Sequence, residues 1–280
     1  MRLAIAIFFA LIVAPSAYAA DLDYLRGSQT VGPALYTNWT GFYAGGDIGY
    51  IVDGSADFSR STGAPIAFAL RVTTLEQEIR PSDWPVLGTD HRGAVSFGGF
   101  VGYNTQWQDV LLGFEGTFTR TALSLDAPST PISRRTPGDS AGNVYDVTIV
   151  GDGTLKNLDY LTLRSRAGWV LGNFLPYGFL GFTLGRADLN VSTTISGIQY
   201  PSGSNGFCGV PAAPCVPFSF TGTAGQNGEF LYGVAVGGGL DYLVTPNIFV
   251  RGEFEYIRFA PVADTVIAIA TARVGAGIRF

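Results

Sequence analysis

The stretch NIFVRGEFEYIRF, Asn247–Phe259, alternates between two kinds of side chain. Successive side chains of a β-strand point to opposite faces, so Arg251, Glu253 and Glu255 share one face. The opposite face carries apolar residues: Ile248, Val250, Phe254 and Tyr256. The stretch therefore predicts a strand with one charged and one apolar wall. Such a strand fits a soluble barrel with charges outside, or a membrane barrel with charges in the lumen.

The same alternation recurs along the chain in segments of about 10–14 residues. Each segment is long enough to cross a bilayer as a tilted strand, which takes about 9–11 residues. Their residues include many strand formers such as Phe, Tyr, Val and Thr. The eight predicted strands are Trp39–Val52, Gly93–Asn104, Val110–Thr121, Tyr160–Leu171, Pro176–Ala187, Glu229–Leu243, Asn247–Phe259 and Val266–Phe280.

The connections between these segments alternate in length. Three are short, with the sequences TQWQD, GNFL and VTP. Three are long, Asp53–Arg92, Ala122–Asp159 and Asp188–Gly228, and the last, APVADT, is shorter. Short periplasmic turns and long external loops are typical of outer-membrane barrels. The sequence predicts an all-β fold, an eight-stranded antiparallel transmembrane β-barrel of up-and-down topology spanning residues 39–280.

Composition excludes several other classes of protein. Mean hydropathy is +0.26 and charged residues make up 14%, against about 25% in ordinary soluble domains. Beyond the N-terminal region no apolar run is long enough for a membrane helix. The net charge of −5 and the lack of a basic cluster argue against a nucleic-acid partner.

The N-terminus has the layout of an export signal. Arg2 precedes an apolar run from Leu3 to Ala14, and Ala17-Tyr18-Ala19 forms a small-residue cleavage motif. We predict a signal peptide over residues 1–19, removed on export, and a periplasmic segment over residues 20–38. The expected location is the outer membrane of a Gram-negative bacterium.

Charged residues on the predicted inner faces form a candidate lumen network. They carry both signs and are expected to pair, because an unpaired buried charge is costly. Its residues are Asp47, Glu115, Arg164, Arg166, Glu229, Asp241, Arg251, Glu253, Glu255, Arg273 and Arg279. Aromatic residues gather at the predicted periplasmic strand ends, as in an interfacial girdle. They are Trp39, Trp107, Trp169, Tyr177 and Tyr242, with Phe280 at the same level.

Other chemistry-bearing residues are few. Cys208 and Cys215 lie in a Gly/Pro-rich stretch of an exported chain, and we predict a disulfide between them. His91 is the only histidine, and a catalytic constellation with Ser82, Ser96 and Asp90 is formally possible. Proximity in sequence is weak evidence for such a constellation, so the sequence predicts no enzyme, no cofactor and no metal site.

Three stretches carry a family resemblance. NWTGFYAGGDIGY (Asn38–Tyr50) resembles the first strand of alphaproteobacterial small outer-membrane β-barrel proteins. Tyr232–Phe259 is similar to their penultimate hairpin, and RVGAGIRF at the C-terminus to their last strand. The resemblance covers the strands, about half of the chain. It implies a porin-like protein with an OmpA-type eight-stranded barrel, built by the barrel assembly machinery with periplasmic chaperones, with Phe280 as the assembly signal.

These observations predict an integral outer-membrane protein with a structural or surface-interaction role. Two alternatives stay open: a small channel or uptake porin, and a surface adhesin that binds haem or a host ligand through its long loops. The remaining expected partners are outer-membrane lipid and lipopolysaccharide.

Overall fold

The computed structural model describes residues 38–127, 129–204, 207–208 and 214–280. The described residues belong to one compact unit, Thr37–Phe280. The predicted signal peptide and most of the predicted periplasmic segment therefore lie outside the described residues.

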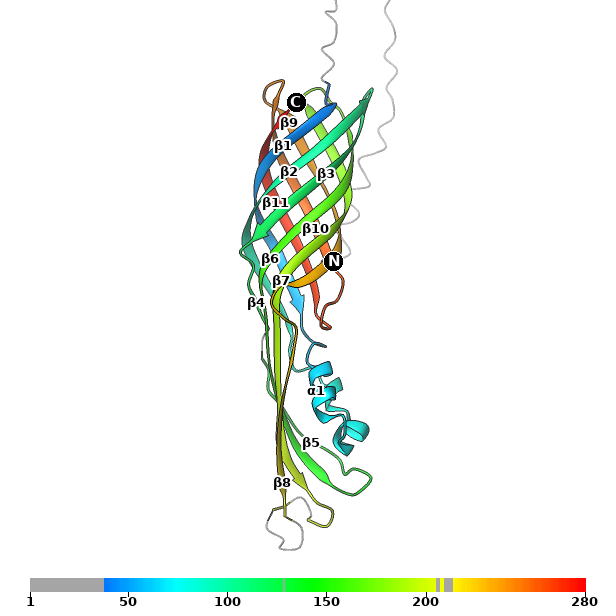
Figure 1. Cartoon of the computed structure of the whole chain (residues 1–280), viewed down its shortest axis with the longest axis vertical. Helices are drawn as coiled ribbons and strands as arrows, with labels where there is room; N and C mark the ends of the chain where they lie inside the picture. Colours follow the sequence, from blue (N-terminus) through cyan, green and yellow to red (C-terminus); the bar gives the residue numbers. More distant parts are fainter. Residues whose placement is uncertain (1–37, 128, 205–206, 209–213) are drawn as a thin grey trace, which may run out of the picture. The chain divides into compact units, whose positions relative to one another are not determined.

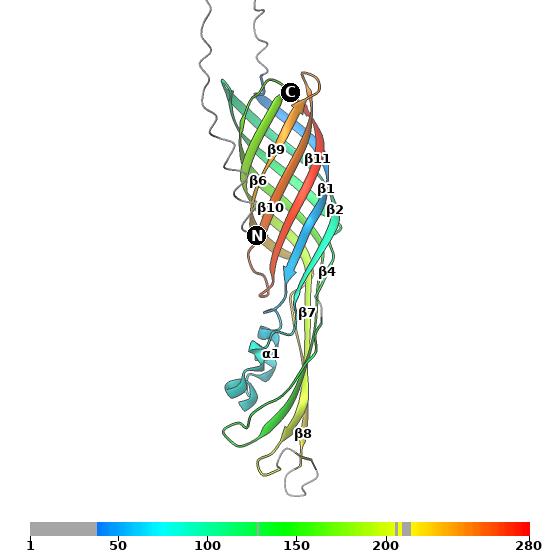
Figure 2. The same ribbon diagram turned by 180° about the vertical axis from the view of Figure 1, so that it is seen from behind.

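Eight long strands form a closed antiparallel ring (Figures 1 and 2). The first and last strands of the ring pair from Tyr43 opposite Arg279 to Asp57 opposite Val266, with one shift of register between Ile51 and Asp53. Closure leaves no unpaired edge in the wall, as a lipid-embedded sheet requires. The strands in ring order are β1 (Gly41–Asp57), β2 (Thr89–Trp107), β3 (Val110–Thr121), β6 (Val144–Trp169), β7 (Phe174–Tyr200), β9 (Glu229–Leu243), β10 (Ile248–Phe259) and β11 (Val266–Arg279).

This ring confirms the predicted all-β antiparallel fold. Strands β3 and β9 have the predicted bounds, and β1, β2, β10 and β11 differ from them by a few residues. Strands β6 and β7 are much longer than expected, at 26 and 27 residues. The alternating residues Val144–Val150 are the first part of β6. They pair with the last part of β7, as far as Val144 opposite Tyr200, so both strands run on past the ring.

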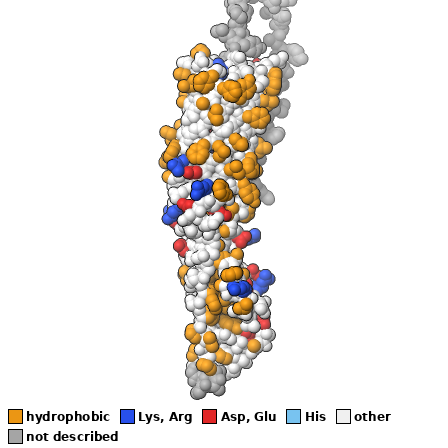
Figure 3. Space-filling model, viewed as in Figure 1, with side chains coloured by type: hydrophobic (Ala, Val, Ile, Leu, Met, Phe, Trp, Pro, Cys, Tyr) orange, Lys and Arg blue, Asp and Glu red, His pale blue; other side chains and the backbone are white. Residues whose placement is uncertain are grey.

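The outer wall of the ring is apolar. On β10 the outward residues Val250, Phe254 and Tyr256 are 41–50% exposed, whereas Arg251, Glu253 and Glu255 are buried inside. Figure 3 shows apolar side chains spread over the barrel wall and charged side chains gathered near the end of the barrel from which β6 and β7 run on. Arg120 on β3 and Asp159 on β6 form an exposed ion pair, with Nη2 and Oδ2 3.0 Å apart.

Beyond this end of the ring, the long connections build a second sheet. β5 (Ile132–Arg135), the extensions of β6 and β7, and β8 (Val216–Ala224) pair in that order, and the two-residue β4 (Leu125–Asp126) pairs with β6 nearer the ring. One face of this sheet carries a small core that includes Tyr145, Val147, Ile149 and Ile195. The first long connection covers it with α1 (Gly63–Leu70), the π-turn η1 (Leu75–Ile79) and the 3-10 turn η2 (Pro81–Asp83).

The sequence of α1, GAPIAFAL, places Ile66 and Leu70 one turn apart, and both are buried in this core. The helix ends before Val72, Thr73 and Thr74, whose β-branched side chains disfavour its continuation. Within the described part of the chain, no helix is long and apolar enough to cross a membrane.

Candidate functional site: the barrel interior and the sheet beyond it

The interior of the barrel is filled by three stacked layers of side chains. Strand β10 passes through all three, with Phe249 in the first, Arg251 to Glu255 in the second, and Ile257 in the third. The first layer, at the end with short turns, is aromatic and aliphatic: Trp39, Tyr43, Phe100, Leu111, Val170, Leu175, Tyr177, Phe179, Leu243 and Phe249. The third is mostly aliphatic, with Tyr160 and Phe259 beside Ile51, Leu231, Ile257, Ile267 and Ile269. An ionic layer is thus enclosed between two apolar ones.

The ionic layer joins strands on opposite sides of the barrel. Arg164 on β6 donates from Nη1 and Nη2 to the two carboxylate oxygens of Glu253 on β10, both at 2.7 Å, and also pairs with Glu115. Arg251 Nη1 lies 2.8 Å from Glu115 Oε2, and its Nε lies 2.8 Å from Asp241 Oδ1.

Two further arginines complete the layer. Arg166 Nη2 lies 2.6 Å from Asp241 Oδ2. Arg273 pairs with Glu255, and its Nε lies 3.4 Å from Glu253 Oε1. These side chains are 0–2% exposed. Four guanidinium groups therefore face four carboxylates with solvent excluded, the arrangement in which buried charges are tolerated.

Three of the eleven predicted lumen residues lie outside this network. Glu229 and Arg279 were wrong predictions: each lies at a strand end, partly exposed, and Arg279 Nη2 donates to the carbonyl of Pro246 at 2.7 Å. Alternation predicts the face of a residue but not its depth in the barrel. Asp47 is buried in the interior at 7% exposure, yet its Oδ1 has no hydrogen-bond partner among the described residues.

The predicted aromatic girdle needs a correction at two positions. Trp107 and Trp169 are 58% and 53% exposed on the outer wall, and Tyr242 is 37% exposed. Trp39 and Tyr177, in contrast, are 2% and 6% exposed and belong to the first interior layer. Trp39 precedes β1, so strand alternation does not fix its direction, and its Nε1 reaches Gly172 O at 3.4 Å.

Tyr177 faces inward because it shares the inner face of β7 with Leu175 and Phe179. Its hydroxyl donates to Glu253 Oε2 at 2.8 Å, and Tyr43 makes the equivalent bond to Glu115 Oε2 at 2.7 Å. Sequence reasoning missed this role for both tyrosines. For Tyr43, the inner face that it shares with Asp47 on β1 was the signal that could have found it. The inner face of β7 carries no charged residue that could have pointed to Tyr177.

The second sheet and the segment that covers it together form an extension of the barrel. Asp139, in the turn between β5 and β6, makes several hydrogen bonds within this extension. Its Oδ1 accepts from the backbone of Asn143 at 2.7 Å, and its Oδ2 accepts from Tyr145 Oη at 2.8 Å and Thr74 Oγ1 at 3.3 Å. Burial works against the charged form, but the hydrogen bonds from Asn143, Tyr145 and Thr74 outweigh it and lower the pKa of Asp139. Ser140 N also donates to Glu78 Oε2 at 2.7 Å. These bonds hold the turn against residues 63–83, which contain α1, η1 and η2 and are called the cover segment below.

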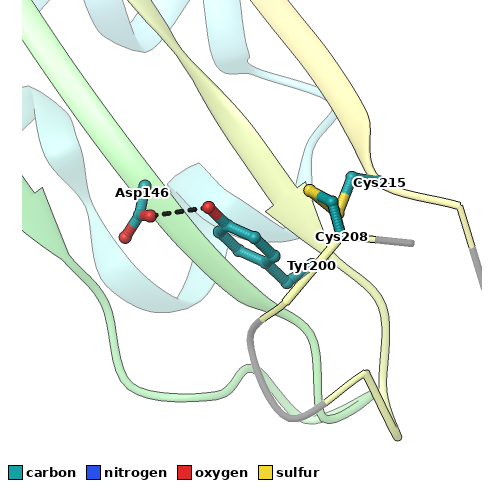
Figure 4. Close-up of a disulfide and its surroundings, with 4 residues drawn as sticks. All are labelled: Asp146, Tyr200, Cys208 and Cys215. Carbon is teal, nitrogen blue, oxygen red and sulfur yellow. Dashed lines mark hydrogen bonds between the residues drawn. A yellow bond between two sulfur atoms is a disulfide. The ribbon is translucent and has the colours of Figure 1, made fainter. Parts of the chain in front are cut away.

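The predicted disulfide between Cys208 and Cys215 is confirmed, with Cα atoms 5.5 Å apart (Figure 4). It lies in the connection between β7 and β8, close to Tyr200, whose hydroxyl donates to Asp146 Oδ2 at 2.8 Å. The disulfide therefore closes the connection at the far end of the second sheet.

The residues of the formal catalytic constellation have different partners. His91 Nδ1 lies 2.9 Å from Asp53 Oδ1 on the exposed wall, while Ser96 is buried on the inner face of β2. The hydroxyl of Ser82 bonds to Glu76, and Asp90 Oδ2 accepts from Arg92 Nε at 2.8 Å. Nor do the described residues include a group of three or more His, Cys, Asp or Glu placed to hold a metal.

Comparison with known proteins gives the family. The model of the outer membrane protein beta-barrel domain matches residues 7–280. No curated protein matches the chain. Among solved structures, the chain is similar to Ail, the attachment invasion locus protein of Yersinia pestis, at 16% identity, with a TM-score of 0.30 and coverage of 86% of this chain and 99% of that one.

Two further solved structures are similar. Neisserial surface protein A is 13% identical, with a TM-score of 0.36 and coverage of 86% and 98%. The outer membrane protease OmpT of Escherichia coli is 10% identical, with a TM-score of 0.27 and coverage of 86% and 97%. Because the family model matches nearly the whole chain, this protein belongs to the outer membrane protein beta-barrel family and is an outer-membrane protein.

Proposed function

We propose that this chain is a non-catalytic surface protein whose sealed barrel anchors an extracellular sheet for interaction with other molecules. The observation that carries the proposal is the layered barrel interior. An ionic layer of buried Arg–carboxylate pairs lies between two apolar layers, so ions have no continuous polar route along the axis. The structured part outside the ring is the sheet of β5, β6, β7 and β8 with its cover segment.

The channel alternative is disfavoured by the same layers. Eight strands enclose a lumen that side chains fill, and here Trp39, Phe249 and Phe100 close the end with short turns. For ions to pass, the side chains of Trp39, Phe249 and Phe100 would have to leave their buried cluster. The ion pairs of the ionic layer would also have to separate.

A non-catalytic role is supported by the separation of the candidate catalytic groups. His91 pairs with Asp53 on the outside, while Ser96 lies inside the barrel, so one substrate atom cannot meet both. Family membership alone is compatible with enzymes and non-enzymes.

The remaining features of the proposal concern export and partners. The composition of residues 1–19 supports a cleaved signal peptide, and Asn38–Tyr50 supports an alphaproteobacterial origin. Assembly by the barrel assembly machinery with periplasmic chaperones, contact with lipopolysaccharide, and a host or haem ligand at the extracellular connections belong to the same proposal.

Planar-bilayer recording on the folded, full-length protein tests the sealed anchor. We expect no stepwise conductance, and heat-modifiable migration on gels controls for folding. Single-channel steps from heat-modifiable protein would overturn the sealed anchor in favour of a channel. The His91→Ala variant, analysed for lipopolysaccharide structure in cells, is expected to match the wild type.

A further inference from the structure

Strand β8 is an edge strand outside the membrane. It pairs with β7 from Val191 opposite Ala224 to Gln199 opposite Val216. In the described ranges no strand pairs with its other side, which leaves a row of backbone groups without a ladder partner. Figure 2 shows β8 at the border of the sheet.

The cover segment lies on a face of β8 and leaves its edge open. A Cβ atom added at Gly222 would lie 2.8 Å from Pro65 Cβ of α1. Because a Cβ points out of the plane of a sheet, α1 packs above the strand and not beside it. Glycine at this position permits the close approach, and the hydrogen-bonding edge of β8 is free of the helix.

The opposite border of the same sheet is protected in the usual way. β5 has only four residues, and two of them are Arg134 and Arg135. Short length and charge are the common devices against unwanted pairing of edge strands. β8, in contrast, has nine residues, VPFSFTGTA, and none is charged. Pro217, near the start of the strand, is its single residue without a backbone donor.

A cleft with both apolar and polar lining adjoins this edge on the face that carries α1. It has a volume of about 390 Å³ and is lined by aromatic rings from Phe218, Phe220 and Tyr145, with Leu70 and Val72 from the cover segment. Phe220 is 37% exposed and Val72 83% exposed, so the cleft opens to solvent. The side-chain amide of Gln199 also lines it and adds a hydrogen-bonding group.

We propose that the free edge of β8 docks an extended segment of another protein as an added strand, with an aromatic side chain of that segment in the cleft. The inference rests on the surface role proposed above and names its class of partner. In this mode backbone hydrogen bonds supply affinity and alternate side chains supply specificity. Residues directly opposite across a strand pair have Cβ atoms about 5 Å apart, so a ring beside Phe220 enters the cleft.

The chemistry of the edge also defines the segment. Nine residues of β8 extend for about 30 Å, which sets the length of the added strand. The edge has no charge to attract or repel, so an uncharged segment of alternating β-formers fits it. A charged segment would lose hydration without gaining an ion pair.

The test is a selection of nine-residue peptides displayed in a random library, on the folded full-length protein in lipid nanodiscs. The variant Ser219→Lys/Thr223→Lys places two charges on the edge strand, away from the cleft face, and serves for counter-selection. Ser133→Lys places a charge on β5 as the matched control. Selected peptides are then synthesised with N-methyl groups at alternate positions, which remove donors from one edge of the peptide.

We expect uncharged, alternating peptides with an aromatic residue. Binding should weaken at least tenfold with N-methylation of one register and in Ser219→Lys/Thr223→Lys, and should be unchanged in Ser133→Lys. Phe220→Ala should abolish the preference for the aromatic residue. Selection of no peptide from the wild type, or equal binding to the charged variant, would overturn the proposal.

A second copy of the chain as the occupant would also overturn it, and would show as dimers in nanodiscs that Ser219→Lys/Thr223→Lys abolishes. The bilayer recording tests the sealed anchor independently of peptide binding. Heat-modifiable protein that gives no conductance supports the anchor whatever the peptides do, so the two proposals fail separately.

Discussion

Arg164 and Glu253 form a two-pronged ion pair across the barrel, 89 residues apart in sequence, with both N–O distances at 2.7 Å. Their strands, β6 and β10, are separated in the ring by β7 and β9. The pair therefore ties opposite walls together through the interior. It sits where a pore would run, and this single contact serves both the stability of the barrel and its closure.

Removing one partner of this pair should destabilise the barrel strongly. Glu253→Gln keeps the size of the side chain but leaves Arg164 and Arg273 with less compensating charge in a solvent-free layer. The expected loss in free energy of unfolding is about 3–5 kcal/mol. Urea unfolding in detergent micelles, followed by heat-modifiable migration, measures it. Glu229→Gln, at a partly exposed strand end, is the matched control and should change little; a loss below 1 kcal/mol for Glu253→Gln would contradict the account.

Trp39 should behave as an interior residue and Trp107 as an interfacial one. Lipids brominated near the headgroup should quench the fluorescence of Trp107 and Trp169 but leave Trp39 largely unaffected, as measured on variants that retain one tryptophan. Trp39→Ala should cost about 3–5 kcal/mol because it opens a cavity in a packed layer. Strong quenching of Trp39 would instead return it to the outer girdle.

The contrast between Trp39 and Trp107 shows what sequence could predict. Alternation within a strand put Arg251, Glu253 and Glu255 on one face, and the prediction of a membrane barrel then put that face inside, as the structure has it. Trp39 stands before β1 begins, where no strand geometry orients it, so its direction depends on tertiary packing alone. Depth along the axis is likewise a tertiary property, which explains Arg279 and Glu229.

The second sheet could be predicted only in part. Residues Val144–Val150 alternate as the barrel strands do, but the pairing of β8 with β7 depends on contacts between the long connections. The stacking of α1 on that sheet has the same origin. Periodicity within one segment carries no information on which other segment it meets.

Acidification should loosen the turn at Asp139. The pKa of this carboxyl is lowered in the folded protein, so its hydrogen bonds stabilise the turn at neutral pH and are lost as pH falls from the ordinary aspartate value of about 3.9 through the folded-state pKa. The amide protons of Ala141 and Asn143 both donate to Asp139 Oδ1, at 3.0 and 2.7 Å, and should report the titration by NMR. A midpoint at or above the ordinary value would contradict the prediction. Asp139→Asn should abolish the titration.

Phe280 should matter for assembly more than for stability. Its backbone N–H donates to Phe42 O at 2.9 Å, which any residue at this position retains, and its side chain is 78% exposed on the outer wall. The free energy of unfolding of Phe280→Asp in micelles should therefore be close to that of the wild type, since a charge near the interface costs only about 0–1 kcal/mol. In cells the same variant should give several-fold less folded barrel, because the resemblance of the last strand implies that Phe280 is the assembly signal. Phe42→Asp is the matched control, since Phe42 is 64% exposed at the same end of the barrel. Equal cellular amounts of folded Phe280→Asp and Phe42→Asp would contradict an assembly role for Phe280. A loss of stability in micelles that accounts for the cellular loss would show that Phe280 acts only by stabilising the barrel wall.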